Sequence, residues 1–379
     1  MYSVVDLFAG CGGLSRGLAM TGEFGTDFAV EIEPHSAGAF AANIAGRNGS
    51  PASVFTGDIM VLVNDPAKLR TQLEKFGLAI PGSLDLLAGG PPCQGFSRNG
   101  VRRYEESGQR FYDLPINHLY KAFLKVLELT MPRVVLIENV REFLRAGGGK
   151  FRDDLFTRLE ELGYKAEAFI VCAADYGVPQ MRYRMIVLAY RDGCVVQFPQ
   201  ASRASAEYRT VLDAIADLPP AAYLDKKAML RYSEHGQVSE YAQSLRSKSG
   251  WVANHYGRVL SERNAHRLRA VGTGRMRDVA ADLQTKSFYG GAYGRLSWNE
   301  PSLTITTWVY HVGSGRFGHP SEDRGITMRE AARLQSFDDD FVFPPLINPV
   351  SRMIGNAVPP MLAKAFGLEI AQALRSDSW

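Results

Sequence analysis

Short apolar runs alternate with helix-like segments through the first 190 residues, and this alternation constrains the fold more than any other feature of the chain. Runs with the length and composition of buried strands lie at 4–8, 28–31, 83–88, 133–138, 168–172 and 185–189. Helices are expected at 14–20, from Pro34 onward, and at 66–76, 116–130 and 151–162. This order predicts an α/β fold, with a doubly wound, Rossmann-like parallel sheet covered by helices on both faces.

The pattern changes near residue 193. From there to about 345 the sequence contains short turns, stretches rich in Arg, Ser and Gly, and scattered aromatic residues. One helix is expected inside this region, because Thr327 and Glu330 have capping-box spacing ahead of apolar residues. Beyond it, the tail at 357–374 returns to a helical, Ala- and Leu-rich composition. We therefore expect an α/β core over 1–192, a smaller and less regular domain over 193–345, and a return to the core over 346–379.

Composition is typical of a soluble intracellular protein. Hydrophobic residues make up 46% of the chain, and no apolar stretch reaches the ~18 residues that a membrane span needs. The chain starts in an apolar run without a preceding basic segment, so we expect no secretory signal and a cytoplasmic location. We also expect no metal site, because no metal-binding spacing is found among the cysteines, which are Cys11, Cys93, Cys172 and Cys194.

Charge is distributed unevenly along the chain. The net charge is +3, but residues 191–325 contain 18 Lys or Arg residues against 13 Asp or Glu residues. A polyanionic partner that contacts the middle of the chain would account for this excess. Solvated helix faces are the alternative for about half of the candidate phosphate contacts. The candidates are Arg246, Lys248, Arg258, Arg263, Arg267, Arg269, Arg275 and Arg277.

The sequence GGPPCQGFS at 89–97 follows the apolar run at 83–88. Its glycines allow a tight turn, and its two prolines stiffen the loop immediately before Cys93. The thiol would then stand at the carboxyl end of a strand, where open α/β sheets bind ligands. A rigidly held nucleophile suits covalent catalysis, whereas a buried cysteine in an ordinary turn is the plainer alternative.

Glycines also follow the first strand, in the sequence FAGCGGL at 8–14. Ser15 occupies the place of the third glycine of a dinucleotide-binding turn, so a pyrophosphate is not required here. The turn can still present helix N–H groups to a carboxylate. Glu31, 21 residues after Gly10, could hold ribose hydroxyls, and Asp58 could accept a hydrogen bond from an adenine amino group. Each acid alone is typical of a cap or a solvated loop, but together with the turn they indicate a nucleoside site.

Three charged residues follow later strands. Glu138 ends the run at 133–138, so its carboxyl group should reach the same sheet edge as Cys93 and could hold or donate a proton. Arg182 and Arg184 alternate along an extended chain and should therefore share one face. Two guanidinium groups on one face could stabilise an oxyanion or bind a phosphate. A salt-bridged glutamate and two surface arginines are the alternatives.

Taken together, the motifs resemble those of the cytosine-5 DNA methyltransferase family, and they occur in the order usual for that family. The matching segments lie at 6–14, 89–97, 138–140, 180–184, 295–307, 327–337 and 355–360. They cover most of the chain outside about 193–290, which the resemblance implies to be the target-recognition region. The chain departs from the family at 114–117, where LPIN replaces a DPRN run. Ile116 removes a charge there, which puts an arginine contact in doubt.

The resemblance implies a covalent mechanism on a flipped-out cytosine. Cys93 would attack carbon 6 of the ring, Glu138 would support protonation at nitrogen 3, and Arg184 would contact the 2-keto oxygen, with Arg182 as a further catalytic candidate. The loop 98–113 would close over DNA. The resemblance also implies an S-adenosylmethionine pocket formed by Phe8, Ala9, Gly10, Cys11, Gly12, Gly13, Leu14, Glu31, Ile32, Asp58, Ile59, Pro91, Asn356, Ala357 and Val358. It implies DNA contacts at Gln94, Ser97, Arg98, Arg295 and Thr306.

The implied partners are double-stranded DNA and a cognate restriction endonuclease, and the implied state is a monomer in a prokaryotic cytoplasm, associated with the nucleoid. One alternative is an RNA or tRNA cytosine-5 methyltransferase on the same fold. Its tRNA-modifying relatives carry Cys-Phe-Thr in the middle domain, whereas Cys194 is followed here by two valines. A catalytically silent DNA-binding relative is a further alternative, although such proteins tend to lose the thiol or the acid.

Overall fold

The computed structural model describes residues 1–92, 114–191, 193–223, 225–232, 238–285 and 290–376, which divide into two compact units. The first unit comprises Met1–Cys172, Tyr183–Gln200 and Leu362–Trp379, and the second comprises Ala173–Arg182 and Ala201–Met361. These limits differ from the expected ones in three places. Residues 173–182 belong to the second unit, the first unit continues to Gln200 instead of ending at 192, and the chain returns to the first unit at 362 instead of 346.

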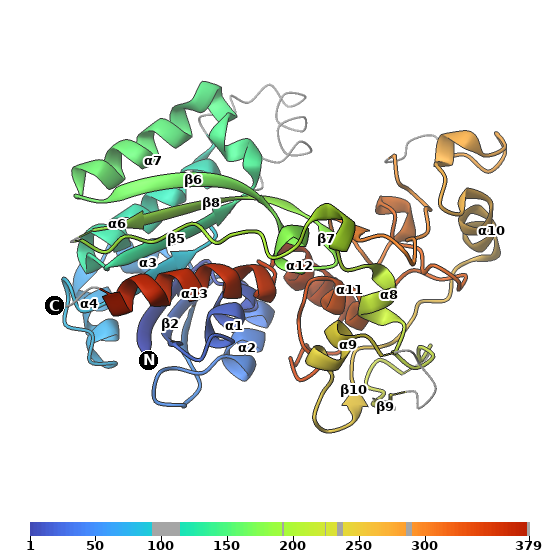
Figure 1. Cartoon of the computed structure of the whole chain (residues 1–379), viewed down its shortest axis with the longest axis horizontal. Coiled ribbons are helices and arrows are strands. Elements are labelled where there is room, and N and C mark those ends of the chain that lie inside the picture. Colours follow the sequence, from blue (N-terminus) through green and yellow to red (C-terminus); the bar gives the residue numbers. More distant parts are fainter. Residues whose placement is uncertain (93–113, 192, 224, 233–237, 286–289, 377–379) are drawn as a thin grey trace. The chain divides into compact units, whose positions relative to one another are not determined.

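A seven-stranded sheet forms the centre of the first unit, in the order β3-β2-β1-β4-β5-β8-β6 (Figure 1). The five strands from β3 to β5 are parallel, whereas β8 is antiparallel to both of its neighbours. The strands are β1 (Tyr2–Leu7), β2 (Phe24–Glu31), β3 (Ser53–Thr56), β4 (Leu86–Gly89), β5 (Val134–Asn139), β6 (Lys165–Cys172) and β8 (Tyr183–Tyr190).

The antiparallel strand corrects the expectation of an entirely parallel sheet. Residues 173–182, between β6 and β8, contain only a 3-10 turn and the short strand β7 (Gln180–Met181). A parallel return needs a crossover connection, usually a helix, so β8 pairs with β6 in the opposite direction. The strand composition gives no sign of this direction, because β8 is as apolar as the parallel strands of the sheet.

Helices cover both faces of the sheet, as predicted (Figure 1). One face packs its apolar residues against α3, α4, α6 and α7 in a single core cluster. On the other face, Phe40 of α2 and Ile44 pack with Ala29 of β2 in a smaller cluster. In the same unit, Gly367 of α13 approaches Leu18 of α1. The helices of the unit are α1 (Gly13–Ala19), α2 (Pro34–Asn43), α3 (Met60–Val63), α4 (Pro66–Glu74), α6 (Tyr120–Thr130), α7 (Lys150–Glu161) and α13 (Pro360–Ser376), whose first two residues belong to the second unit.

The second unit is built from short elements and buried ion pairs. Arg333 bridges Asp217 at 2.7 Å and Asp339 at 2.6 Å, and all three side chains are fully buried. The predicted capping box is confirmed, because Thr327 and Glu330 each accept the other's backbone N–H. The helices are α8 (Val211–Ile215), α9 (Glu240–Leu245), α10 (Glu262–Val271), α11 (Met328–Leu334) and α12 (Ile347–Asn356). The strand pairs are β9 (Leu230–Arg231) with β10 (Trp251–Val252), and β7 with β11 (Ser302–Leu303).

Short 3-10 helices complete the two units. They are η2 (Pro115–His118), η3 (Arg141–Leu144), η4 (Ala146–Gly149), η5 (Ala173–Tyr176), η6 (Ser205–Glu207), η7 (Met276–Asp278) and η8 (Val312–Ser314). Among the described helices, none has the length and apolar character needed to cross a bilayer.

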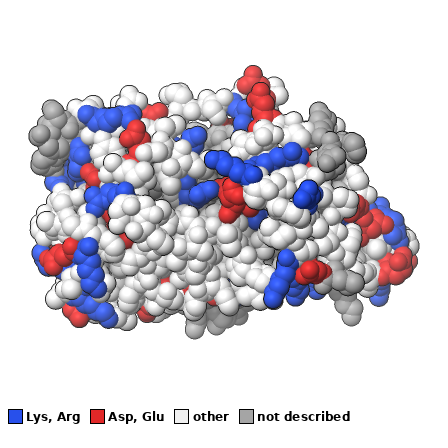
Figure 2. Space-filling view, turned by 90° about the horizontal axis from the view of Figure 1, so that it is seen from below, with Lys and Arg blue, Asp and Glu red and all other residues white. Residues whose placement is uncertain are grey.

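On the face drawn in Figure 2, basic and acidic side chains lie close to one another at several places.

Candidate active site

The strand order places a switch point between β1 and β4. From β1 the chain continues to β2 and β3 on one side of the sheet, and from β4 it continues to β5 on the other. In α/β sheets, ligands bind outside the carboxyl ends of strands at such a point. Gly89 ends β4 there, and a Cβ atom on it would lie 2.3 Å from the carbonyl oxygen of Leu7. Only glycine therefore allows the two strands to approach this closely.

The turn after β1 adopts a left-handed backbone at three positions. The φ angles are +58° at Phe8, +57° at Gly10 and +95° at Gly12, which is the N-cap of α1. A Cβ atom on Gly12 would also lie 2.8 Å from Ile44, so both the conformation and the space require glycine there. Cys11 is buried in this turn, and burial raises its pKa to about 12. This thiol therefore stays protonated near neutral pH and is no nucleophile.

Glu31 connects the turn to the end of β2. Its two carboxyl oxygens accept the backbone N–H groups of Gly10 and Glu33, each at 2.8 Å. Burial raises the pKa of Glu31, although these two hydrogen bonds act in the opposite direction. Each carboxyl oxygen can accept a second hydrogen bond, so the group can still hold ribose hydroxyls.

Ile32 and Asp58 follow the ends of the paired strands β2 and β3. Ile32 follows Glu31 and leaves 67% of its surface exposed. Asp58 lies two residues beyond the end of β3 instead of ending it, and its carboxyl group accepts the N–H of Met60 at 2.9 Å. Asp58 is exposed, whereas the neighbouring Ile59 is buried. An exposed apolar surface and an exposed carboxylate are thus available to an adenine ring.

A buried chain of hydroxyl groups under the turn was missed by sequence reasoning. Ser15 donates a hydrogen bond to Asp6 at 2.6 Å, and Thr26 donates to Ser15 at 3.0 Å. Asp6 is 1% exposed, and burial raises its pKa to about 7. The signal was present in the sequence, since an aspartate inside a buried strand needs a polar partner and Ser15 follows in the first helix.

Glu138 and Asn139 at the end of β5 adjoin the segment that follows β4. Glu138 is 7% exposed, and a Cβ atom on Gly90 would lie 3.3 Å from its Oε2 atom. The Asn139 side chain donates a hydrogen bond to the carbonyl oxygen of Pro91 at 3.1 Å. The backbone two residues before Cys93 is therefore held beside Glu138 and Asn139. Cys93 itself lies outside the described residues, as do Gln94, Ser97, Arg98 and the rest of the loop 98–113.

Arg184 on β8 forms an ion pair with Glu138. Its Nε atom lies 2.9 Å from Oε1 of Glu138, and both side chains are largely buried. Within the described residues, however, Oε1 receives no hydrogen bond of acceptable angle, so the pair is close without being well aligned. A buried carboxyl oxygen in this state can accept or share a proton with a ligand that enters beside Gly90.

Arg182 differs from the predicted arrangement. It is fully buried and donates hydrogen bonds to the carbonyl oxygens of Ile305 at 3.2 Å, Gly355 at 3.0 Å and Ala357 at 2.9 Å. These acceptors all belong to the second unit, whereas Arg184 belongs to the first. The two arginines do not share partners, because the chain leaves its strand pairing between β7 and β8. We assign Arg182 a structural role and keep Arg184 as the candidate for catalysis.

The remaining predicted contacts lie in the second unit. Arg295 donates to the carbonyl oxygen of His319 at 2.9 Å, to that of Glu322, and to the carboxylate of Asp323. Its guanidinium is thus held by internal acceptors, which separates it from the expected DNA contact. Thr306 is exposed, as is Asn356, while Ala357 and Val358 are buried.

The eight basic candidates between 246 and 277 divide into two groups. Arg246 pairs with the buried Asp217, Arg269 pairs with Glu262 and Asp323, and Arg277 pairs with Asp278. Arg267 donates to the carbonyl oxygen of Leu283. Among the described residues, no carboxylate forms an ion pair with Lys248, Arg258, Arg263 or Arg275. The second group combines an unneutralised charge with an exposed side chain, which suits phosphate contacts, whereas Arg267 keeps its charge but is half-buried and bound to internal acceptors.

Comparison with known proteins gives consistent matches over the whole chain. The family model for C-5 cytosine-specific DNA methylase matches residues 2–372. The Type II methyltransferase M1.HphI of Haemophilus parahaemolyticus is 33% identical over 95% of this chain and 84% of that protein. The DNA (cytosine-5)-methyltransferase 1A of Oryza sativa subsp. japonica is 30% identical over 98% of this chain, which spans 28% of that longer protein. A solved structure from E. coli, described as a DNA modification methyltransferase encoded within a prophage, covers 99% of this chain and all of its own, with a TM-score of 0.76 and 25% identity.

Proposed function

Because the chain belongs to the family of C-5 cytosine-specific DNA methylases, we propose that it transfers a methyl group from S-adenosylmethionine to carbon 5 of cytosine in double-stranded DNA. The observation that carries the proposal is the buried Glu138 carboxyl group. It lies beside Gly90 and Arg184, next to the backbone that leads to Cys93. A carboxyl group that can exchange a proton with the ring, next to a cation, is what an attack on an aromatic ring requires.

In the proposed reaction, the thiolate of Cys93 forms a bond to carbon 6 of a cytosine that has left the base stack. Glu138 gives a proton to nitrogen 3 as the ring accepts electron density, and Arg184 stabilises the 2-keto oxygen. Carbon 5 then becomes nucleophilic enough to accept a methyl group, whose bond to the donor sulfur breaks as the bond to carbon 5 forms. Water takes the carbon-5 proton, the bond between carbon 6 and sulfur breaks and expels the thiolate, and nitrogen 3 returns its proton to Glu138, so the enzyme regains its starting state.

Residues of the first unit fit the methyl donor. The carboxyl group of Glu31 can hold its ribose, Ile32 and Asp58 can contact its adenine, and the left-handed turn at 8–12 leaves room for its amino acid portion. When bound, S-adenosylmethionine supplies an electrophilic methyl group on a sulfonium sulfur.

We further propose that residues 193–290 contribute to target recognition, and that the protein acts as a monomer in a prokaryotic cytoplasm, with or without a cognate restriction endonuclease. The relative from Haemophilus parahaemolyticus is named as a Type II methyltransferase, which supports this setting. Lys248, Arg263 and Arg275 supply unpaired positive charge for phosphate contacts.

The proposed reaction predicts that Cys93→Ser abolishes methyl transfer while cofactor binding remains, because a hydroxyl is a far poorer nucleophile than a thiolate. Bisulfite sequencing of plasmid DNA from cells that express the chain reports both the modified atom and its sequence context. A duplex containing 5-fluorocytosine should trap the unaltered enzyme covalently at Cys93. Methylation by the serine variant at a rate close to that of the unaltered enzyme would contradict the mechanism.

A further inference from the structure

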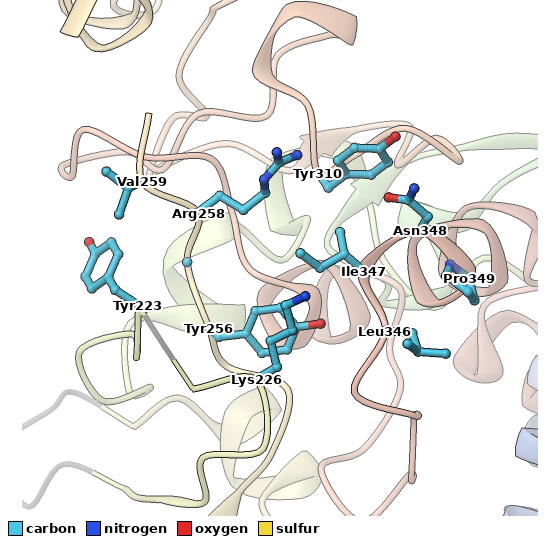
Figure 3. A pocket seen from close by; sticks show the side chains of 11 residues that line it. Tyr223, Lys226, Tyr256, Arg258, Val259, Tyr310, Leu346, Ile347, Asn348 and Pro349 are labelled. Atoms are coloured by element: carbon cyan, nitrogen blue, oxygen red, sulfur yellow. The ribbon is translucent and has the colours of Figure 1, made fainter. Parts of the chain in front are cut away.

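A pocket of about 730 Å³ lies within the second unit, outside the residues assigned to methyl transfer (Figure 3). A volume in this range accommodates a small organic ligand. Four parts of the unit line it, and they contribute Tyr223 with Lys226, residues 256–259, Tyr310 and residues 346–349.

Backbone hydrogen bonds hold two of these segments together. Gly257 donates to the carbonyl oxygen of Ala222 at 2.7 Å, and Ala222 donates to that of His255 at 3.0 Å. A Cβ atom on Gly257 would lie 3.2 Å from the ring of Tyr223, so glycine permits the close contact of the two chains. This wall of the pocket is therefore formed before any ligand arrives.

The lining is positively charged. Lys226 and Arg258 both line the pocket, no Asp or Glu is among its lining residues, and neither cation pairs with a described carboxylate. The guanidinium of Arg258 lies 5.6 Å from the centre of the Tyr310 ring, so it forms a cation–π contact with that ring. Ile347 and Asn348 belong to the first turn of α12, where backbone N–H groups have no intrahelical acceptor. These groups together favour an anion.

Tyr256 supplies an independent indication that a ligand belongs here. Its side chain lines the pocket and is 5% exposed, yet its hydroxyl group has no hydrogen-bond partner in the described part of the chain. Buried hydroxyl groups are almost always paired, and one that is not suggests a missing partner. Burial raises its pKa to about 12, so the group remains a neutral donor.

Aromatic rings complete the lining. Tyr223 is 46% exposed at the rim and Tyr310 lies under the Arg258 guanidinium, so both can offer a ring face to a planar group. An anion joined to a planar aromatic ring is the chemistry of a nucleotide. The hydroxyl group of Tyr223 contacts Glu322 at 3.3 Å, which leaves its ring available.

We propose that this pocket binds one nucleotide other than the target cytosine, with its phosphate near Lys226, Arg258 and the start of α12 and its base against a tyrosine ring. The nucleotide is either a unit of the DNA strand or a free nucleotide. If the nucleotide belongs to the DNA strand, the inference rests on the proposed function. If it is a free nucleotide, the inference does not depend on that function.

Calorimetric titration of the full chain with dAMP and with deoxyadenosine tests the shared chemistry. We expect dAMP to bind about tenfold more tightly than deoxyadenosine, because only dAMP carries the phosphate. Arg258→Gln and Lys226→Gln should each weaken dAMP binding about five- to tenfold. Lys227→Gln is the matched control, since Lys227 is exposed and adjacent but does not line the pocket, and its affinity for dAMP should be unchanged.

A fluorescent DNA duplex distinguishes the two sources. If Arg258→Gln also weakens DNA binding and dAMP competes with the duplex, the pocket holds a nucleotide of the strand. If only dAMP binding is lost, the pocket holds a free nucleotide. The inference is overturned if the unaltered chain does not bind dAMP and Arg258→Gln binds DNA normally. A chain that binds dAMP but does not methylate DNA would contradict the proposed function alone.

Tyr256→Phe separates ligand binding from a structural role. Removal of an unpaired buried hydroxyl should leave the melting temperature equal or higher, while dAMP binding weakens. A lower melting temperature with unchanged dAMP affinity would show that the hydroxyl has an internal partner, which would count against the inference.

Discussion

At the scale of single residues, the partners of a buried charge distinguish a reactive group from a structural one. Arg182 donates to three backbone carbonyl oxygens and has no exposed surface. Glu138 has a close cation but an Oε1 atom without a hydrogen bond from the described residues. A buried polar atom in that state costs folding free energy, and substrate binding can recover it. Both residues look alike in the sequence, because each is a charge beside an apolar strand.

The role of Glu138 predicts a large effect on rate with little effect on DNA affinity. Glu138→Gln should lower the rate of methyl transfer about 10²–10⁴-fold, because an amide cannot give a proton to nitrogen 3. Single-turnover transfer of a tritiated methyl group measures the rate, and filter binding measures the affinity. Glu161→Gln, at an exposed position of α7, is the matched control. Near-normal turnover at saturating DNA would make Glu138 a structural residue.

Asp6 predicts a pH dependence of stability. Its pKa in the folded chain is about 7, against an ordinary value of 3.8. Between these values the unfolded chain loses the proton and the folded chain keeps it, so the free energy of unfolding falls as pH rises toward 7. Asp6→Asn should remove this decline, which amounts to about 3 kcal/mol between pH 5 and pH 8. Urea unfolding at the two pH values measures it, and the exposed Asp282→Asn is the control.

At the scale of elements, apolar patterning predicted most strands and helices of the first unit and the parallel direction of five strands, but it missed α3, the reversed direction of β8 and several element ends. Pro34 and Pro66 start α2 and α4, and each N-cap accepts a backbone N–H, so local chemistry determines these helices. The direction of β8 depends on the connection before it, and that connection packs in the second unit. The position of Asp58 depends on where β3 stops pairing with β2, which single-strand periodicity does not report.

Two helical glycines predict opposite effects of the same substitution. A Cβ atom on Gly355 in α12 would lie 2.4 Å from the backbone of Thr306, whereas one on Gly38 in α2 would meet nothing within 4 Å. Gly355→Ala should therefore lower the free energy of unfolding by about 2 kcal/mol or more and reduce activity, since Thr306 and Asn356 flank the contact. Gly38→Ala should raise it by about 0.5–1 kcal/mol. Equal effects in urea titrations would show that the close approach is not maintained in solution.

At the scale of the whole molecule, net charge is a poor guide to DNA contacts, because many arginines of the second unit hold the unit together. The excess of basic over acidic residues in 191–325 predicted a polyanionic partner. The structure shows which of these basic side chains already pair with carboxylates of the same unit. Helix spacing could not have revealed this, since Arg246 pairs with Asp217 across 29 positions of sequence.

This division predicts two kinds of arginine variant. Arg263→Gln and Arg275→Gln should weaken binding on every DNA sequence and reduce the slope of log affinity against log salt by about 1 each. Arg246→Gln should instead lower the free energy of unfolding, because it leaves the buried Asp217 with one fewer partner. Salt titrations of duplex binding, together with melting temperatures, separate the two. An unchanged slope in both exposed variants would place the phosphate contacts elsewhere.

The first unit is completed only by α13, the last helix of the chain. Helix α13 packs beside α1, where Gly367 approaches Leu18, and Arg375 donates to Glu23 at 2.5 Å (Figure 1). A ribosome that adds 5–20 residues per second needs roughly 10–30 s to pass through residues 201–361 before it reaches that helix. During this interval the nascent sheet is uncovered where α13 will lie. A messenger truncated anywhere in that stretch would yield a protein that presents apolar surface to chaperones and proteases instead of a partly active enzyme.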